Sequence, residues 1–236
     1  ISDPDFYRAL KNTVSISGLS ILFGFPAPII LAILIDDVGK TFFKRIFQTI
    51  SYLPHFVSWV IVATLVYRML DFESGIINYL LQIFGIEPLA FMRNADYFWV
   101  ILIFTVIWKS VGWNSIIYLA AISGIDSQLY DAAMVDGAGK LRRMRHITIP
   151  GIAPTIALMF VLSIGTLFTV NFDAVFNLMN PMVHAKAEVI DTYLYRTGIQ
   201  MARYSYATSI GFMQSTISLL FVVIGFKIAK KVNDYS

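Results

Sequence analysis

Few residues in this 236-residue chain have the types and the spacing that catalysis or metal binding would need. The phosphate-binding pattern G-x4-G-K-[ST], the zinc pattern H-E-x-x-H and the nucleophile pattern G-x-S-x-G do not occur. His55, His146 and His184 stand far apart with no metal-ligand spacing, and the absence of cysteine rules out disulfides and thiolate sites. The sequence therefore predicts no catalytic residue, no metal ligand and no cofactor bound by this chain itself.

Lys109 is the most unusual polar residue, because it lies in the middle of a long apolar run. The chain is 57% hydrophobic and 14% charged, with a mean hydropathy of +0.70. A soluble domain has about 25% charged residues, so this composition indicates a protein that crosses a membrane several times. A lysine at membrane depth costs about 3 kcal/mol on insertion scales and usually faces a bundle interior or a water-filled cavity. Lys109 is therefore expected either to line a solute path or to pair with carbonyl groups or a neighbouring subunit.

Further polar and aromatic side chains lie where a solute could pass. Asn171 and Asp173 lie toward the outer end of their apolar run, and Arg68 lies at a similar depth, which predicts an Arg68–Asp173 ion pair. Several aromatic residues stand beside polar neighbours, an arrangement that suits a sugar, although tryptophan in a membrane span is more often structural. The candidates for the solute path are Trp59, Tyr67, Trp108, Lys109, Trp113, Asn114, Asn171 and Asp173.

Five apolar runs are long enough to act as the spans that position these residues. Pro26 and Pro28 are expected to bend the first run, and Pro54 interrupts the second. A shorter apolar patch, 76–84, predicts a helix lying in the membrane interface. The chain is thus predicted to be an all-α integral membrane protein whose residues 1–236 form a single transmembrane domain. The predicted spans are 14–35, 46–70, 97–122, 152–176 and 207–229.

The basic residues are unevenly distributed among the segments between these spans. Ten of the 18 Lys and Arg residues lie in 36–45, in 124–150 and at the C-terminal end. Cytoplasmic loops of membrane proteins carry an excess of Lys and Arg, so these three segments are predicted to face the cytoplasm. Segments 71–96 and 177–206 then face outward.

The cytoplasmic segment 124–150 has a pattern of its own. A helix start is expected at Asp126 or Ser127, whose side chains can accept hydrogen bonds from free backbone N–H groups. Gly137 predicts a turn, because glycine tolerates backbone angles that a side chain opposes. A basic helix over 140–146 follows. Two short helices around a glycine turn, with clustered positive charge, predict a compact docking element at the cytoplasmic face.

Asp131 opens the pattern D-A-A in this element, Gly137 follows, and the pattern I-x-I-P ends at Pro150. The combination resembles the EAA loop of binding-protein-dependent ABC importer permeases, in which Glu is more frequent where Asp131 stands and Leu where Ile149 stands. The resemblance implies a type I ABC importer transmembrane-domain fold and a coupling helix that sits in a cleft of an ATPase subunit. The alternative is an ordinary cytoplasmic loop with a chance pattern. The resemblance assigns ATPase coupling to Asp131, Ala132, Ala133, Asp136, Gly137, Ala138, Arg142 and Pro150.

A second pattern follows the fourth predicted span, with N-F-D at 171–173 and E-V-I-D-T-Y-L-Y-R-T-G from Glu188 to Gly198. It resembles the branch of sugar permeases that includes polysaccharide and oligosaccharide transport proteins. Members of that branch have six core spans, so a first span is expected to precede this chain. The resemblance also implies the partners: a second homologous permease that completes a heterodimeric pore, two ABC ATPase subunits that bind ATP and Mg, and an extracytoplasmic solute-binding protein.

The same resemblance implies a multi-pass subunit in the plasma (inner) membrane of a prokaryote, in contact with lipid and not with nucleic acid. The predicted function is that of a permease subunit of an ABC importer for an oligosaccharide or another sugar, coupled to ATP hydrolysis through 126–146. An ABC permease for another solute, such as phosphate or an amino acid, is one alternative, and a self-sufficient channel or secondary transporter is another. Only the last would transport solute without an ATPase.

Overall fold

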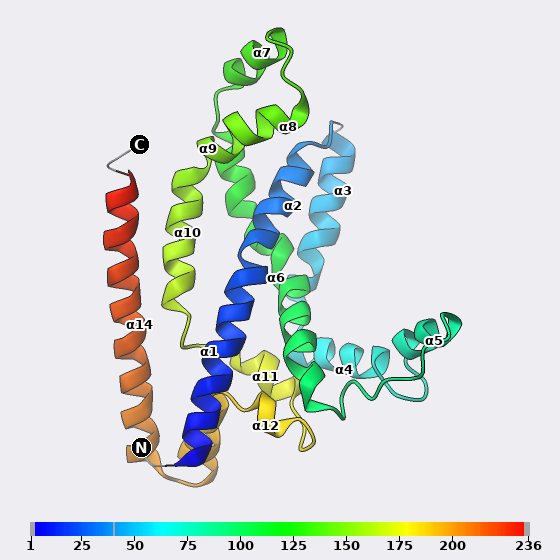
Figure 1. Cartoon of the computed structure of the whole chain (residues 1–236), viewed down its shortest axis with the longest axis vertical. Helices are drawn as coiled ribbons and strands as arrows, with labels where there is room; N and C mark the ends of the chain where they lie inside the picture. The colour runs from blue at the N-terminus through cyan, green and yellow to red at the C-terminus, as the bar shows by residue number, and fades with distance from the viewer. Residues whose placement is uncertain (1–2, 40, 234–236) are drawn as a thin grey trace.

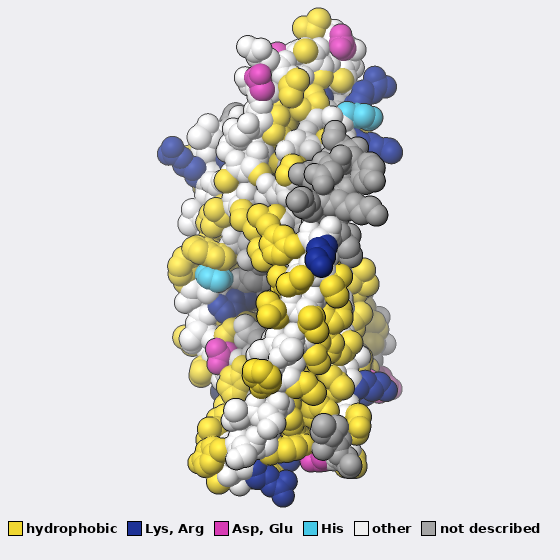
Figure 2. All heavy atoms as spheres, turned by 90° about the vertical axis from the view of Figure 1, so that its left-hand side faces the viewer, with side chains coloured by type: hydrophobic (Ala, Val, Ile, Leu, Met, Phe, Trp, Pro, Cys, Tyr) yellow, Lys and Arg dark blue, Asp and Glu magenta, His cyan; other side chains and the backbone are white. Residues whose placement is uncertain are grey.

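The computed structural model describes residues 3–39 and 41–233, with side chains described as far as Lys227. All regular secondary structure in this part of the chain is helical, as predicted (Figure 1). Long helices run along the long axis of the molecule, and short ones cluster at its two ends. Over the side of the molecule shown in Figure 2, hydrophobic side chains are spread along the middle, as expected for a surface that faces lipid.

The helix that contains the first apolar run begins earlier than the run itself. Helices α1 (Pro4–Gly24) and α2 (Pro26–Asp36) together form an apolar helical segment of 33 residues, interrupted only at Phe25, just before the predicted proline bend. The side chain of Asp3 caps α1 by accepting the N–H of Asp5 at 2.9 Å. Hydropathy alone missed the first ten residues of α1, because this part is polar in sequence but packs against other protein elements instead of lipid.

The second apolar run does not form one straight span. Helix α3 (Thr41–Tyr52) leads into a 3-10 turn, η1 (Leu53–Phe56), and α4 (Trp59–Met69) then leaves at an angle of 101° to them. Figure 1 shows α4 lying across the long axis. Pro54 interrupts the run, as predicted, and the predicted span 46–70 consists of two helices that meet at this bend.

Helix α5 (Ile76–Ile83) confirms the short helix that was predicted between the second and third spans. Asn78, which is buried, fixes it to the surrounding loop. Its amide donates to the carbonyls of Asp71 at 3.1 Å and Leu89 at 3.0 Å, and its side-chain oxygen accepts the N–H of Leu89 at 2.9 Å. A short turn, η2 (Ala95–Tyr97), then leads into the next long helix.

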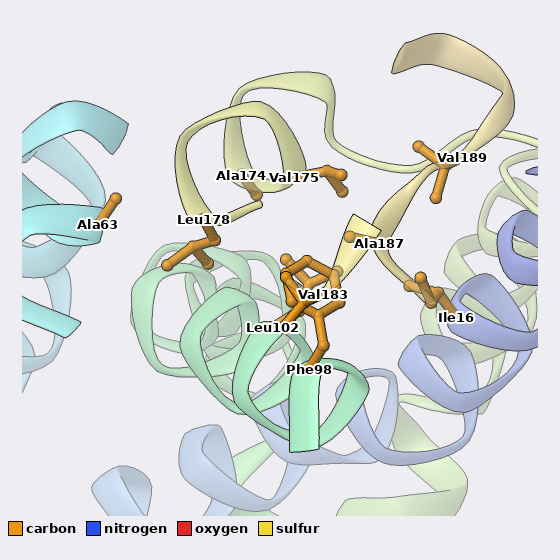
Figure 3. Packing of buried hydrophobic residues seen from close by; sticks show 10 residues of the cluster. All are labelled: Ile16, Ala63, Phe98, Leu102, Ala174, Val175, Leu178, Val183, Ala187 and Val189. Atoms are coloured by element: carbon orange, nitrogen blue, oxygen red, sulfur yellow. The ribbon is translucent and has the colours of Figure 1, made fainter. Parts of the chain in front are cut away.

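Helix α6 (Phe98–Ser123) is the central element, and its ends lie within one residue of those of the predicted third span. Toward one end of the molecule it packs against α2, where Ala32, Tyr118, Ile122 and Ile152 form a buried cluster. Toward the other end, its residues Phe98 and Leu102 belong to a larger cluster. Figure 3 shows side chains from α1, α4 and α6 converging there with those of the segment 174–189.

The fourth apolar run is divided. Helix α10 (Ala153–Gly165) ends well before the predicted boundary, the chain continues without a helix over 166–171, and α11 (Phe172–Leu178) starts afresh. Asn171 caps α11 by accepting the N–H of Ala174 at 2.9 Å. The predicted span 152–176 is therefore not one continuous helix. Short helices α12 (His184–Ala187) and α13 (Ile190–Leu194), with the π-helical turn η4 (Tyr195–Gln200), lead into α14 (Tyr204–Asn233).

Three helical segments in the described part are long and apolar enough to cross a membrane: 4–36, 95–123 and 204–227. Two further segments reach this length only if a bent pair of helices counts as one span, with bends of 101° in 41–69 and 62° in 140–165. The five predicted spans are therefore compatible with the structure but not confirmed by it.

The two ends of the molecule differ in the way that the topology prediction requires. Loops 36–45 and 124–150 lie at one end, together with the end of α14, and we call this the basic end (Figure 1). Segments 71–96 and 177–206 lie at the opposite end, where α1 begins. Of the basic residues that support the prediction, Lys40 and the side chains of Lys230 and Lys231 lie outside the described part.

Candidate functional site

The docking element at the basic end consists of α7 (Ser127–Val135), a turn, and α8 (Lys140–Arg143). Asp126 caps α7, as predicted, because its carboxylate accepts the N–H of Gln128 at 2.9 Å. The helix ends at Val135, and Gly137, two residues further on, has a φ of +76°. The N–H groups of Gly137 and Ala138 donate back to the carbonyls of Met134 at 3.0 Å and Ala133 at 2.8 Å. This pair of bonds is typical of a left-handed helix end, where glycine avoids a steric cost, so the predicted glycine turn is confirmed.

The second helix of the element is longer than its α-helical part. Helix α8 continues through a π-helical turn, η3 (Met144–Thr148), into α9 (Ile149–Gly151), and α10 follows after one residue. Tyr130 on α7 makes a hydroxyl–hydroxyl hydrogen bond of 2.9 Å with Thr148. Lys140 forms an ion pair of 2.9 Å with Asp37, at the end of α2. The docking element is thus connected both to the start of α10 and to the end of α2.

The docking element, which lies at the top of Figure 1, carries large apolar side chains that are exposed. Val135 is 89% exposed and Leu141 is 72% exposed, and Leu129 and Met134 are also exposed. Exposed apolar groups among polar and basic residues are typical of a surface that binds another protein. Of the predicted coupling residues, Ala133 and Ala138 are half-buried; those that lie exposed are Asp131, Ala132, Asp136, Gly137, Arg142 and Pro150.

A cavity of about 880 Å³ lies between α1, α2, α6 and α10. Three of the predicted solute-path residues, Trp113, Asn114 and Asn171, line it. Every lining residue in the described part of the chain is uncharged. Hydroxyl groups that were not predicted also line the cavity, and their spacing of three residues within α1 and near the end of α10 was the available signal in the sequence. They belong to Ser17, Ser20, Ser110, Ser163, Thr166 and Thr169.

Lys109 does not line this cavity. Its ammonium group donates to the carbonyls of Pro54 at 3.2 Å and His55 at 2.6 Å, and it lies 5.4 Å from the ring centre of Trp59. Of the two alternatives that the sequence left open, the structure shows the pairing with carbonyl groups. Trp59 therefore supports the lysine, and Trp108, which is 43% exposed, lies outside the cavity lining as well.

The remaining solute-path candidates lie near the opposite end. Tyr67 donates to the carbonyl of Leu178 at 2.9 Å and lines a separate cavity of about 190 Å³. Asp173 is exposed in the first turn of α11. The predicted Arg68–Asp173 ion pair is wrong, since the described residues contain no such contact. The prediction assumed straight spans and compared the depths of the two residues along them. The bend before α4 changes the position of Arg68, and the break before α11 changes that of Asp173.

A buried ionic cluster at the same end was not predicted. Glu188 is 1% exposed and accepts two hydrogen bonds from Arg196, at 2.7 and 3.1 Å. Arg8 lies 3.6 Å from the same carboxylate, and Asp5 lies 3.2 Å from Arg196. The hydrogen bonds with Glu188 raise the pKa of the Arg196 guanidinium. In the sequence, Glu188 and Arg196 stood out only as part of a family pattern. In the structure they connect α1 to α13 and η4.

Comparison with known proteins agrees with this geometry. The family described as "Binding-protein-dependent transport system inner membrane component" matches residues 24–233. Protein LplB of Bacillus subtilis is 40% identical over 98% of this chain and 73% of its own length. The polygalacturonan/rhamnogalacturonan transport system permease protein YteP of the same organism is 41% identical over 99% of this chain and 73% of its own length.

A solved structure gives the same result. The crystal structure of a bacterial ABC transporter involved in the import of the acidic polysaccharide alginate has a chain with 41% identity and a TM-score of 0.94, covering 98% of this chain and 81% of that one. An amino acid ABC transporter with 15% identity and a TM-score of 0.58 shares the fold alone. The resemblance inferred from the docking element and the predicted ABC importer permease fold are thus confirmed. This chain belongs to the family of binding-protein-dependent transport system inner membrane components.

Proposed function

We propose that this chain is the transmembrane permease subunit of an ATP-binding-cassette importer, and that it moves an oligosaccharide or another sugar delivered by an external solute-binding protein. The observation that carries the proposal is the docking element at the basic end. It exposes apolar side chains at Val135 and Leu141, and its shape depends on a left-handed Gly137. A surface of this kind needs a protein partner.

The relatives and the cavity both support a sugar as the solute. The names of YteP and of the alginate importer refer to polysaccharides, and a lactose permease, LacF of Rhizobium radiobacter, is 30% identical over 95% of this chain. The cavity between α1, α2, α6 and α10 presents hydroxyl and carboxamide groups next to the ring of Trp113. Uncharged hydrogen-bonding groups beside an aromatic face match the alternating hydroxyl and C–H surfaces of a sugar.

ATP and Mg are assigned to partner subunits. The sequence carries no G-x4-G-K-[ST] pattern, the usual means by which an ATPase holds phosphate groups. Two ABC ATPase subunits would supply that chemistry, and a second homologous permease would complete the pore. An alginate importer has been solved in complex with an alginate pentasaccharide-bound periplasmic protein, which supports an external delivery protein for this chain as well.

The contacts of the docking element suggest how movement of an ATPase reaches the cavity. A displacement of α7 by the ATPase would be transmitted through the Tyr130–Thr148 hydrogen bond to α9 and the start of α10. A displacement of α8 would be transmitted through the Lys140–Asp37 ion pair to α2. Both α2 and α10 border the cavity. Closing of the ATPase dimer would thereby alter the cavity walls.

The test uses the complete transporter reconstituted in liposomes with the solute-binding protein. ATP hydrolysis is measured over a panel of oligosaccharides, of phosphate and of amino acids, and uptake is measured in parallel. We expect an oligosaccharide to stimulate both activities, and the purified chain alone to hydrolyse no ATP. Stimulation by phosphate or an amino acid alone would contradict the sugar assignment, and uptake by the chain without an ATPase would contradict the ABC mechanism.

A further inference from the structure

The bend between α3 and α4 creates a problem of hydrogen bonding at membrane depth. It turns the chain by 101° within a run that has the apolar length of a span. A bend frees backbone carbonyl groups, and inside a bilayer each free carbonyl needs a partner from the protein. Pro54 adds to the problem, because proline cannot donate a backbone hydrogen bond.

Lys109, on the neighbouring helix α6, donates hydrogen bonds to carbonyl groups of the bend. Its ammonium group donates to the carbonyls of both Pro54 and His55, and the residue is only 7% exposed. The ring of Trp59, the first residue of α4, lies 5.4 Å from the charge. No acidic side chain in the described part of the chain forms an ion pair with Lys109. The positive charge of Lys109 is therefore stabilised by two backbone carbonyls and one aromatic ring of the bend.

Two further residues on the same face of α6 contact the bend. Gly112 and Trp113 follow Lys109 at helical spacings of three and four residues, which place all three on one side of the helix. A Cβ atom on Gly112 would collide with the backbone carbonyl of Ser51. The ring of Trp113 stacks on that of His55, with centres 4.6 Å apart and planes 4° apart. We call Lys109, Gly112 and Trp113 the bend seat.

The bend seat also borders the cavity, because Trp113 lines its wall. We propose that Lys109 is a positioning residue for transport: its ammonium group sets the angle between α3 and α4, and the His55–Trp113 stack passes this angle to the cavity wall. The inference rests on the proposed transport function. A buried cation with no acidic partner is costly in a membrane, and the two backbone carbonyls of the bend offset that cost for Lys109. The Pro54 carbonyl also accepts the N–H of Val57 at 3.2 Å, so the shorter bond to the His55 carbonyl, at 2.6 Å, is the main contribution of Lys109 to the bend.

The angle can be measured directly, because the chain has no native cysteine. Spin labels at Thr49→Cys on α3 and Thr64→Cys on α4, both exposed positions, report the distance across the bend in the assembled transporter with cysteine-free partners. We expect one narrow distance distribution. Lys109→Met should increase the share of other distances by about tenfold, the value of one charge-assisted hydrogen bond, and Lys109→Arg should restore the narrow distribution. Lys11→Met, at an exposed lysine of α1, is the matched control.

A second variant keeps the test decisive if Lys109→Met does not accumulate in the membrane. Gly112→Ala leaves the charge in place but forces the Ser51 carbonyl away from α6, so it should shift the same distance. Gly18→Ala, where the added methyl group meets nothing within 4 Å, is its control. The inference is overturned if Lys109→Met has the same distance distribution as the wild type. If only Gly112→Ala can be made, an unchanged distribution in that variant overturns it.

Transport is then measured with the oligosaccharide that stimulates the wild-type transporter most. Lys109→Met should lower the stimulation by about tenfold while the ATPase subunits still co-purify, and Lys109→Arg should restore it. Unchanged stimulation despite an altered distance would show that the bend angle does not control transport, and would also overturn the inference. If no sugar stimulates the wild type, the proposed function fails, whereas the spin-label result still decides whether Lys109 sets the angle.

Discussion

Gly137 holds a backbone conformation that other residues rarely adopt, and its substitution is the sharpest residue-level test of the docking element. At a φ of +76° a side chain costs on the order of 1–2 kcal/mol. Gly137→Asp should therefore leave the permease inserted in the membrane but lower attachment of the ATPase, because the angle between α7 and α8 changes. Asp131→Lys should act in the same direction by reversing a charge on the exposed face of α7. Co-purification of the ATPase and uptake in membrane vesicles measure both effects.

The matched control for Gly137 lies two residues further on. Gly139 has a φ of −67°, which any residue can adopt, and a Cβ there meets nothing within 4 Å. Gly139→Asp introduces the same charge without the strain and should retain more ATPase than Gly137→Asp. If Gly137→Asp and Asp131→Lys both keep wild-type attachment and uptake, the segment 124–150 is not the coupling element.

Glu188 is expected to matter for stability. Its carboxylate is buried and has Arg196 and Arg8 as partners, so Glu188→Gln leaves the guanidinium groups poorly compensated. Breaking a buried pair from one side costs about 3 kcal/mol. The thermal unfolding midpoint of the detergent-solubilised transporter should fall by several degrees. Asp96→Asn is the control, since its 3.8 Å pair with Lys186 is exposed on both sides and should contribute almost nothing.

Single residues also show where sequence reasoning stops. The turn at Gly137 was predictable, because glycine between two short helical patterns is a local signal. Lys109 was recognised as unusual from its depth, but its partners are the carbonyls of Pro54 and His55, more than fifty positions earlier in the chain. Backbone carbonyls have no sequence signature. Only the packing of the bend against α6 shows that they are available.

At the scale of elements, α5 depends on a single buried amide. Asn78→Leu removes the hydrogen bonds to Asp71 and Leu89 and leaves the N–H of Leu89 without its partner. The loop around α5 should therefore open more often, with amide hydrogen exchange in 71–92 faster by about tenfold or more. Gln82→Leu, an exposed amide on the same helix, is the matched change. Equal exchange rates in the two variants would show that Asn78 is not the anchor.

The existence of most helices and the interruption at Pro54 followed from the sequence, but the size of the bend there and the break over 166–171 did not. The helix at 97–122 was predicted closely, because α6 is one uninterrupted helix of 26 residues. The runs 46–70 and 152–176 are also apolar, yet one bends by 101° and the other loses its helix over 166–171. Hydropathy measures the preference of a segment for lipid and contains no information on the direction of its helix axis. It cannot distinguish a straight helix from a bent pair whose carbonyls are satisfied elsewhere.

At the scale of the whole molecule, the distribution of basic residues predicts its orientation in the membrane. A single cysteine at Lys140, on the basic end, should react with an impermeant thiol reagent only after the cells are opened. A cysteine at Glu87, exposed at the opposite end, should react in intact cells. Labelling of the Lys140→Cys variant from outside intact cells would reverse the orientation and place the docking element away from any cytoplasmic ATPase.

The attachment of α1 to the segment 185–190 has a consequence for how the protein is made. Asn12 donates to the carbonyls of Ala185 and Glu188, and Thr13 accepts the N–H of Ile190, across 173 to 177 positions of chain. A ribosome adding 5–20 residues per second needs roughly 10–35 s to supply these partners. Until then the side-chain amide of Asn12 lacks these partners, whereas the Thr13 hydroxyl already donates to the carbonyl of Ala9 within α1 at 2.8 Å. The contact layer between α1 and the segment 185–190 is therefore completed only in a late stage of synthesis.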